Sequence, residues 1–191
     1  MKSLPPRLWL LTFAHFTIDS YSSFFSPLLP LLVQKLDLSL GLVGSLVALS
    51  SLSSSFSQPL FGMLSDRLGR PWFLALGPLV AAAFMSAIGL APSYAALVAL
   101  LTLAGLGVAA FHPQAAVLAG EASARRGIAM SVFVTGGTLG FAVGPIVAVT
   151  IASRLGLDRT WLAMFPGLAV GAVLLVWVTR MAPRAHAARR G

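Results

Sequence analysis

The segment GMLSDRLGRP, residues 62–71, gathers charge in a chain that otherwise avoids it. Asp66, Arg67 and Arg70 lie within a stretch of five residues, and a glycine flanks the group on its N-terminal side while another lies within it. The segment separates two long apolar runs. Glycine permits a tight reversal of the backbone, and the charged side chains can pair with one another or with helix ends. The pattern therefore indicates a turn between two apolar elements, either an ordinary basic loop or a specific contact.

The composition indicates where such a turn lies. Of the 191 residues, 58% are hydrophobic and only 9% are charged, whereas a soluble domain of this size carries about 25% charged residues. This balance leaves too little polar surface for a water-soluble domain and predicts an integral membrane protein. The net charge of +8 is typical of basic loops on one side of a membrane, so we expect no nucleic-acid partner.

Six apolar runs reach the length of about 20 residues that a helix needs to cross a bilayer. Backbone polar groups cannot be left exposed to lipid, so each run is expected to be helical. We therefore predict an all-α membrane protein, a single six-helix bundle over residues 1–191. The predicted transmembrane helices are Leu8–Val33, Leu38–Ser65, Trp72–Leu90, Tyr94–Ala119, Ile128–Ser153 and Trp161–Val178.

The positive charges of the connecting segments predict the orientation. With the N-terminus inside, ten Lys and Arg residues lie on the inner side and three, Lys35, Arg154 and Arg159, on the outer side. Since cytoplasmic loops carry the excess of Lys and Arg, both termini are predicted to be cytoplasmic, with residues 179–191 as a basic tail. The ten inner residues are Lys2, Arg7, Arg67, Arg70, Arg125, Arg126, Arg180, Arg184, Arg189 and Arg190.

The first predicted helix carries polar side chains along one face. Thr12, His15, Asp19, Ser22 and Ser26 follow spacings of 3, 4, 3 and 4 residues, which align them on a helix. A carboxylate near the bilayer centre costs about 2.5–3.5 kcal/mol on insertion scales, so Asp19 is expected to face protein or a water-filled cavity. His15 can hydrogen-bond Asp19, and such a pair suits a proton site. The alternative is a structural pair that fixes helix packing.

The fourth predicted helix contains a second intramembrane histidine, His112, followed by Pro113 and Gln114. We predict that His112 and Gln114 line the same cavity and contact substrate or relay protons. The alternative is a histidine that bonds a carbonyl left free by Pro113.

Metal and cofactor sites are not indicated. His15 and Asp19 have the spacing of two metal ligands on a helix, but the fuller ligand set of a metal site is not apparent, and the chain has no cysteine. No nucleotide-binding loop, zinc spacing or haem motif is present. We therefore expect no metal, no cofactor and no enzymatic activity.

Small residues mark two further helices. In the fifth predicted helix, Gly136, Gly140 and Gly144 recur every four residues and form a smooth face for close helix packing, after which Pro145 bends the helix or frees a carbonyl. The second predicted helix is rich in serine over residues 50–58. We expect both helices to pack against a second half, with some serines lining a cavity.

Several of these segments resemble the major facilitator superfamily. The nonapeptide GMLSDRLGR is similar to the loop between the second and third helices of that family, which acts there as a cytoplasmic latch. GGTLGFAVGP, residues 136–145, resembles the glycine-proline signature of its antiporters. AHFTIDSYSSFFSPLLPLL, residues 14–32, and AAFHPQAA, residues 109–116, resemble its fosmidomycin-resistance branch. The latch positions that match are Gly62, Leu64, Asp66, Arg67, Gly69 and Arg70.

The resemblance implies a fold in which six helices form a half with three-plus-three inverted repeats, within a transporter of twelve helices. Two tripeptides at similar depth, FSP at residues 25–27 and FHP at residues 111–113, are in keeping with such a repeat. The chain would pair with itself as a parallel homodimer, or with a C-terminal half.

The resemblance also implies secondary active transport by alternating access, as proton-coupled efflux of a small molecule or drug across a bacterial inner membrane. Many proton antiporters of the family carry an arginine in the fourth helix, and here that helix has none before the histidine. Proton coupling would therefore rest on His15, Asp19 and His112. Uptake of a small organic solute, or a membrane half-protein without transport activity, are the alternatives.

Overall fold

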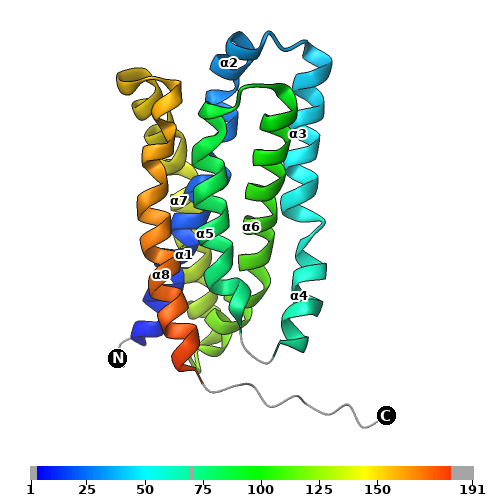
Figure 1. Cartoon of the computed structure of the whole chain (residues 1–191). Helices are drawn as coiled ribbons and strands as arrows, with labels where there is room; N and C mark the ends of the chain where they lie inside the picture. Colours follow the sequence, from blue (N-terminus) through cyan, green and yellow to red (C-terminus); the bar gives the residue numbers. More distant parts are fainter. Residues whose placement is uncertain (1–3, 69–70, 182–191) are drawn as a thin grey trace.

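The computed structural model describes residues 4–68 and 71–181, and the described residues form helices without a strand. The helices run roughly side by side as an elongated bundle, with the start of α1 and the end of α8 at the same end as the turn between α4 and α5 (Figure 1). The elements are α1 (Pro6–Ser22), α2 (Phe25–Leu36), α3 (Leu40–Ser55), α4 (Gln58–Arg67), α5 (Trp72–Ser86), η1 (Ala87–Leu90), α6 (Tyr94–Glu121), α7 (Arg126–Leu155), η2 (Leu157–Ala163) and α8 (Met164–Arg180).

Among the described residues, five helical segments are long and apolar enough to cross a membrane. They are Leu40–Arg67, Trp72–Leu90, Tyr94–Glu121, Arg126–Leu155 and Leu157–Arg180. The remaining predicted span, Leu8–Val33, corresponds to α1 and α2, of 17 and 12 residues, and neither alone has the length of a membrane helix. The count of six spans, the inverted repeat and the orientation stay predictions.

The predicted span Leu8–Val33 is interrupted in the structure, because the helix breaks at Ser23 and Phe24. The Ser23 hydroxyl donates to the Ser20 carbonyl at 2.9 Å, a local bond that competes with the helical pattern. Pro27 has no N–H to give to the carbonyl four residues earlier. Both effects coincide at the break, so α1 and α2 are separate helices.

The predicted helix Leu38–Ser65 is divided in the same way. It separates into α3 and α4 at Phe56 and Ser57, and Pro59 follows at the second position of α4. At that place proline lacks an N–H that the first turn leaves unbonded in any case. Proline therefore favours a new helix start over the continuation of α3.

The glycines of α7 pack against α1 of the same chain. A methyl group built on Gly140 or Gly144 would overlap the main-chain oxygen of Phe16 or Ser20, so the two backbones touch. The expectation that this glycine face meets a second half is therefore wrong. Small residues allow helices to approach until their backbones are in contact, and here that contact fixes α1 inside the bundle.

Helix α8 is held to α1 by a buried tyrosine. The hydroxyl of Tyr21 donates to the Ala163 carbonyl at 2.6 Å and accepts from the Gly167 amide at 2.9 Å. Buried apolar side chains fill the bundle in two clusters, one around Phe111 and Phe133 and the other around Phe24 and Phe25. The Tyr21 bonds satisfy main-chain groups at the start of α8 that would otherwise lack partners.

Helices α3 and α4 remain largely uncovered. The buried residues of α3 are Leu46 and Ser53, and within the described residues α4 has none. Ser53 lies against Gly105 of α6, where a side chain would not fit. One side of α3 therefore packs on α6, while most of its surface faces outward.

Candidate functional site

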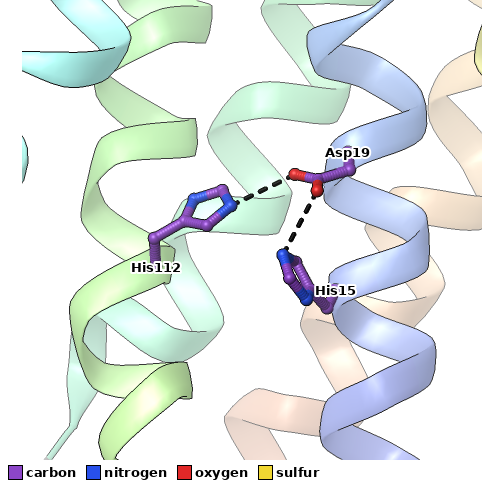
Figure 2. A group of neighbouring side chains, drawn as sticks. All are labelled: His15, Asp19 and His112. Carbon is purple, nitrogen blue, oxygen red and sulfur yellow. Dashed lines mark hydrogen bonds and ion pairs between the residues drawn. The ribbon is translucent and has the colours of Figure 1, made fainter. Parts of the chain in front are cut away.

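Asp19 is bracketed by two histidines at the contact between α1 and α6. Its Oδ2 lies 3.2 Å from Nε2 of His15, one turn earlier on α1, and its Oδ1 lies 3.1 Å from Nε2 of His112 on α6. Figure 2 shows the two imidazole rings reaching the carboxylate from different helices. The structure thus brings together three of the residues that the sequence singled out.

Each histidine is oriented by a main-chain carbonyl. Nδ1 of His15 lies 2.9 Å from the Phe133 oxygen of α7, and Nδ1 of His112 lies 2.8 Å from the Val108 oxygen. A carbonyl oxygen only accepts hydrogen bonds, so each Nδ1 carries the hydrogen. Pro113 would leave the carbonyl of Ala109 without its helical donor. His112 therefore does not simply satisfy the carbonyl that the proline frees.

This tautomer determines what the Nε2 atoms can do. In the neutral imidazole with hydrogen on Nδ1, Nε2 presents a lone pair, and an ionised carboxylate presents lone pairs as well. Each of the two contacts to Asp19 becomes a hydrogen bond only when a proton lies in it. Two protons give the cluster a net charge of +1, and none gives −1. The three side chains together are a place where protons can be held within a membrane helix bundle.

The surroundings of the cluster are apolar on one side and close-packed. The His15 ring stacks on Phe133, with the ring centroids 4.1 Å apart and an angle of 20° between the planes. A Cβ on Gly137 would lie 2.5 Å from His15 Nε2 and 2.6 Å from Asp19 Oδ2. Gly137 therefore makes room for the cluster, a role that the sequence analysis missed. The doubled glycine at positions 136 and 137 was the available signal.

On its other side the cluster opens to two neighbouring cavities. Side chains of Asp19 and His112 are 18% and 23% exposed, against 9% for His15. A cavity of about 410 Å³ is lined by Asp19, His112 and several hydroxyl side chains. A second, of about 490 Å³, shares His112 and Gln58 with it. The hydroxyl groups of the first cavity belong to Ser22, Ser26, Ser50, Ser51 and Ser54.

The predicted polar stripe therefore divides into parts with different surroundings. Asp19, Ser22 and Ser26 reach the cavity, although Ser26 stands on α2 and the Ser22 hydroxyl bonds back to the Asp19 carbonyl at 2.9 Å. Thr12 packs against Gly136 instead. Ser50, Ser51 and Ser54 of α3 line the cavity, whereas Ser53 packs against Gly105 of this chain.

Gln114 does not line the cavity, which corrects the prediction for this residue. It is 4% exposed, its side-chain oxygen accepts from the Leu74 amide at 2.7 Å, and its side-chain nitrogen donates to the Ser65 hydroxyl. Two residues beyond His112 on a helix of 3.6 residues per turn, it points to a different side. Gln114 instead ties α6 to both ends of the turn between α4 and α5.

The described residues of the latch motif, Gly62, Leu64, Asp66 and Arg67, lie on α4. Gly62 is the first of these residues and lines the second cavity, and Asp66 and Arg67 are exposed at the end of α4. Gly69 and Arg70 lie outside the described residues. The role of this motif as a latch stays a prediction.

The cluster also contains more metal-ligating groups than the sequence indicated. His15, Asp19 and His112 each offer one ligand atom, and these atoms lie within 4.8 Å of one another. Reasoning from the i, i+4 spacing found two of them. The third, His112, is 93 residues away from Asp19 in the sequence.

The chain is similar to known membrane transporters over most of its length. It is 29% identical over 186 residues to the fosmidomycin resistance protein of Escherichia coli (strain K12), covering 96% of this chain and 45% of that protein. It is 32% identical over 163 residues to the multidrug resistance protein MdtG of Proteus mirabilis (strain HI4320), covering 82% of this chain and 40% of that protein. The chain thus spans less than half the length of these relatives.

The fold is that of a solved transporter as well. The crystal structure of the peptide transporter POT in complex with sulfate matches with a TM-score of 0.78 at 23% identity, covering 95% of this chain and 40% of that one. The sequence model of the Major Facilitator Superfamily matches residues 8–191. This match, over nearly the whole chain, shows that the chain belongs to the Major Facilitator Superfamily.

Proposed function

We propose that the chain is one half of a proton-coupled secondary transporter that exports a small molecule by alternating access. The observation that carries this proposal is the carboxylate of Asp19 between two histidine Nε2 atoms, beside a cavity lined with hydroxyl groups. Ionisable side chains among apolar membrane helices cost free energy, so such a cluster indicates a functional site by default. The names of the relatives, resistance proteins, favour export over uptake.

Protonation of the cluster controls the position of α1 relative to α6 through the contact between Asp19 and His112. With a proton in each contact, His112 and Asp19 hold the two helices together across 3.1 Å. When the protons leave, two lone-pair-bearing atoms face each other, and their repulsion favours separation. Asp19 and His112 also face the cavity, so a bound solute competes with the protons for the same atoms. Either event changes how α1 lies against α6.

The proposal includes a second six-helix unit in the same orientation. In the family, the substrate cavity lies between two halves that rock against each other, and α3 and α4 leave one side of this chain uncovered. A parallel homodimer and a C-terminal half are both compatible with the predicted cytoplasmic termini. The mass of the particle in native-like lipid distinguishes them.

The test is the exchange of Asp19 for Asn, which removes the charge and keeps the shape. With radiolabelled fosmidomycin as probe in everted vesicles, we expect proton-driven accumulation to fall to the level of empty vesicles. Exchange of labelled for unlabelled probe without a proton gradient should remain, because it does not require proton release. Retained exchange also shows that the variant is folded.

Proton-driven accumulation unchanged in Asp19→Asn would contradict the proposal. Asp158→Asn is the matched control, since it makes the same exchange at an exposed carboxylate that lines neither of the two cavities beside the cluster. Accumulation by this control should stay within about twofold of the unmodified chain, as expected for a surface position away from a specific contact.

A further inference from the structure

The two histidines present the same atom to the same carboxylate in the same tautomer. His15 and His112 each direct Nδ1 to a main-chain carbonyl, at 2.9 Å and 2.8 Å. Their Nε2 atoms consequently face Asp19 as lone pairs when the rings are neutral. A lone pair on Nε2 with an N–H on Nδ1 held by an oxygen acceptor is the arrangement of histidines that ligate metals.

We propose that His15, Asp19 and His112 bind a divalent transition-metal ion of the zinc class. Two imidazole nitrogens and one carboxylate oxygen are the protein ligands of open zinc sites, in which a fourth position is left for water or another ligand. The three atoms lie within 4.8 Å of one another. Around a tetrahedral ion with bonds of about 2.0–2.1 Å they would stand about 3.3 Å apart, so small side-chain movements suffice.

The charges of the cluster favour the same ion. Two neutral imidazoles and one carboxylate carry a charge of −1, and a divalent cation brings the cluster to +1. A positive ion between the three atoms replaces the lone-pair repulsion of both contacts with attraction. Hard cations such as Mg²⁺ and Ca²⁺ prefer oxygen ligands, whereas imidazole nitrogen suits zinc, cobalt and nickel.

The position of the cluster supplies both support and access. Phe133 stacks on His15 and presents the carbonyl that orients it, and Gly137 leaves no side chain where the ligands meet. Asp19 and His112 border the cavity of about 410 Å³. The fourth coordination position therefore faces the cavity, where a water molecule or an oxygen of a bound solute can occupy it.

The experiment measures metal binding by the full chain in lipid nanodiscs, purified with an affinity tag that contains no histidine. Titration with Zn²⁺ is expected to show one saturable site for each chain, and a tenfold excess of Mg²⁺ should leave it occupied. Cobalt in its place should give the strong visible absorption of a four-coordinate site. His112→Ala and His15→Ala should each weaken binding by about tenfold or more, since loss of an orienting partner alone has effects of about that size.

The control variant is His186→Ala. The chain has three histidines, and this one lies in the basic tail outside the described residues, so zinc binding should be unchanged in the variant. Binding that disappears in His186→Ala and persists in His112→Ala would overturn the proposal, as would the absence of a saturable site in the unmodified chain.

X-ray absorption at the zinc edge of the unmodified chain gives a result that needs no variant. Two imidazole ligands with one or two oxygen ligands support the site, and fewer than two imidazoles contradict it. The outcome is independent of the transport test: zinc binding together with accumulation unchanged in Asp19→Asn contradicts the proposed function alone. Accumulation that depends on Asp19, in a chain that binds no zinc, contradicts the metal site alone.

Discussion

The face of α7 that contacts α1 and the side of α3 that borders the cavity both carry small residues, but these residues are used in different ways. Gly136, Gly140 and Gly144 bring α7 onto the backbone of α1. Ser50, Ser51 and Ser54 of α3 instead border a cavity, while Ser53 is buried within the chain. A stripe of small residues indicates that another helix can approach closely. It does not indicate whether that side of the helix meets a helix of the same chain or borders a cavity.

The comparison also separates what makes the chain fold from what it offers to a partner. The buried residues of α7 are glycines and alanines together with Phe133, whereas Leu139, Phe141 and Ile146 of the same helix are exposed. Leu52 of α3, Phe56 at the break and Leu60 of α4 are exposed as well. The folded half is thus held by its glycine contacts, while the surfaces left for lipid or for a second half are apolar side chains.

The largest effect is expected from Gly140→Leu, which tests the packing of α7 on α1. The first side-chain carbon would overlap the main-chain oxygen of Phe16, which cannot move without displacing α1. We expect the free energy of unfolding to fall by about 3 kcal/mol or more. Loss of the folded chain should be visible in size-exclusion chromatography and in thermal melts followed by circular dichroism in detergent. A melting temperature equal to that of the unmodified chain would mean that α7 does not pack on α1 in this way.

A smaller effect is expected at Gln114, which ties α6 to Ser65 of α4 and Leu74 of α5. Gln114→Leu removes its bonds to the Leu74 amide and the Ser65 hydroxyl, although Leu74 keeps its bond to the Pro71 carbonyl at 3.1 Å. We expect a loss of about 1–2 kcal/mol, measured as faster hydrogen exchange over residues 65–74.

The matched control for this change is Gln58→Leu. The amide of Gln58 donates to the Ser54 carbonyl of the neighbouring helix α3 at 3.0 Å, and this residue does not bridge to α6 through a bond in the described structure. Exchange over residues 65–74 should stay as in the unmodified chain. Equal exchange in the two variants would show that Gln114 does not hold the turn.

The smallest effect is expected from Gly44→Leu on α3. Among the described residues, nothing lies within 4 Å of a Cβ at this position, and leucine is a better helix former than glycine by up to about 1 kcal/mol. The melting temperature of the isolated chain should therefore be unchanged or slightly higher. Unfolding of this variant would show that α3 is packed where the structure leaves it exposed. A normal melt with reduced association in lipid would place a partner on α3.

The sequence by itself determined the helical membrane class, the family and the pairing of His15 with Asp19. Composition excludes a soluble domain, and a separation of four residues brings two side chains together on any α-helix. Pro27 and Pro59 stand a few residues beyond the breaks at Ser23–Phe24 and Phe56–Ser57. Proline alone does not locate a break, however, because Pro78, Pro113 and Pro145 lie inside the continuous helices α5, α6 and α7.

The tertiary structure alone decided which distant segments meet. His112 reaches Asp19 because α6 lies beside α1, and the glycines of α7 rest on α1 because both helices share one core. Gln114 has a polar side chain of the kind that can line a cavity. Its position on α6, however, points it toward Leu74 and away from the side of the helix that carries His112. Helical periodicity places a residue on a face of its own helix, but the neighbour of that face depends on how all the helices pack together.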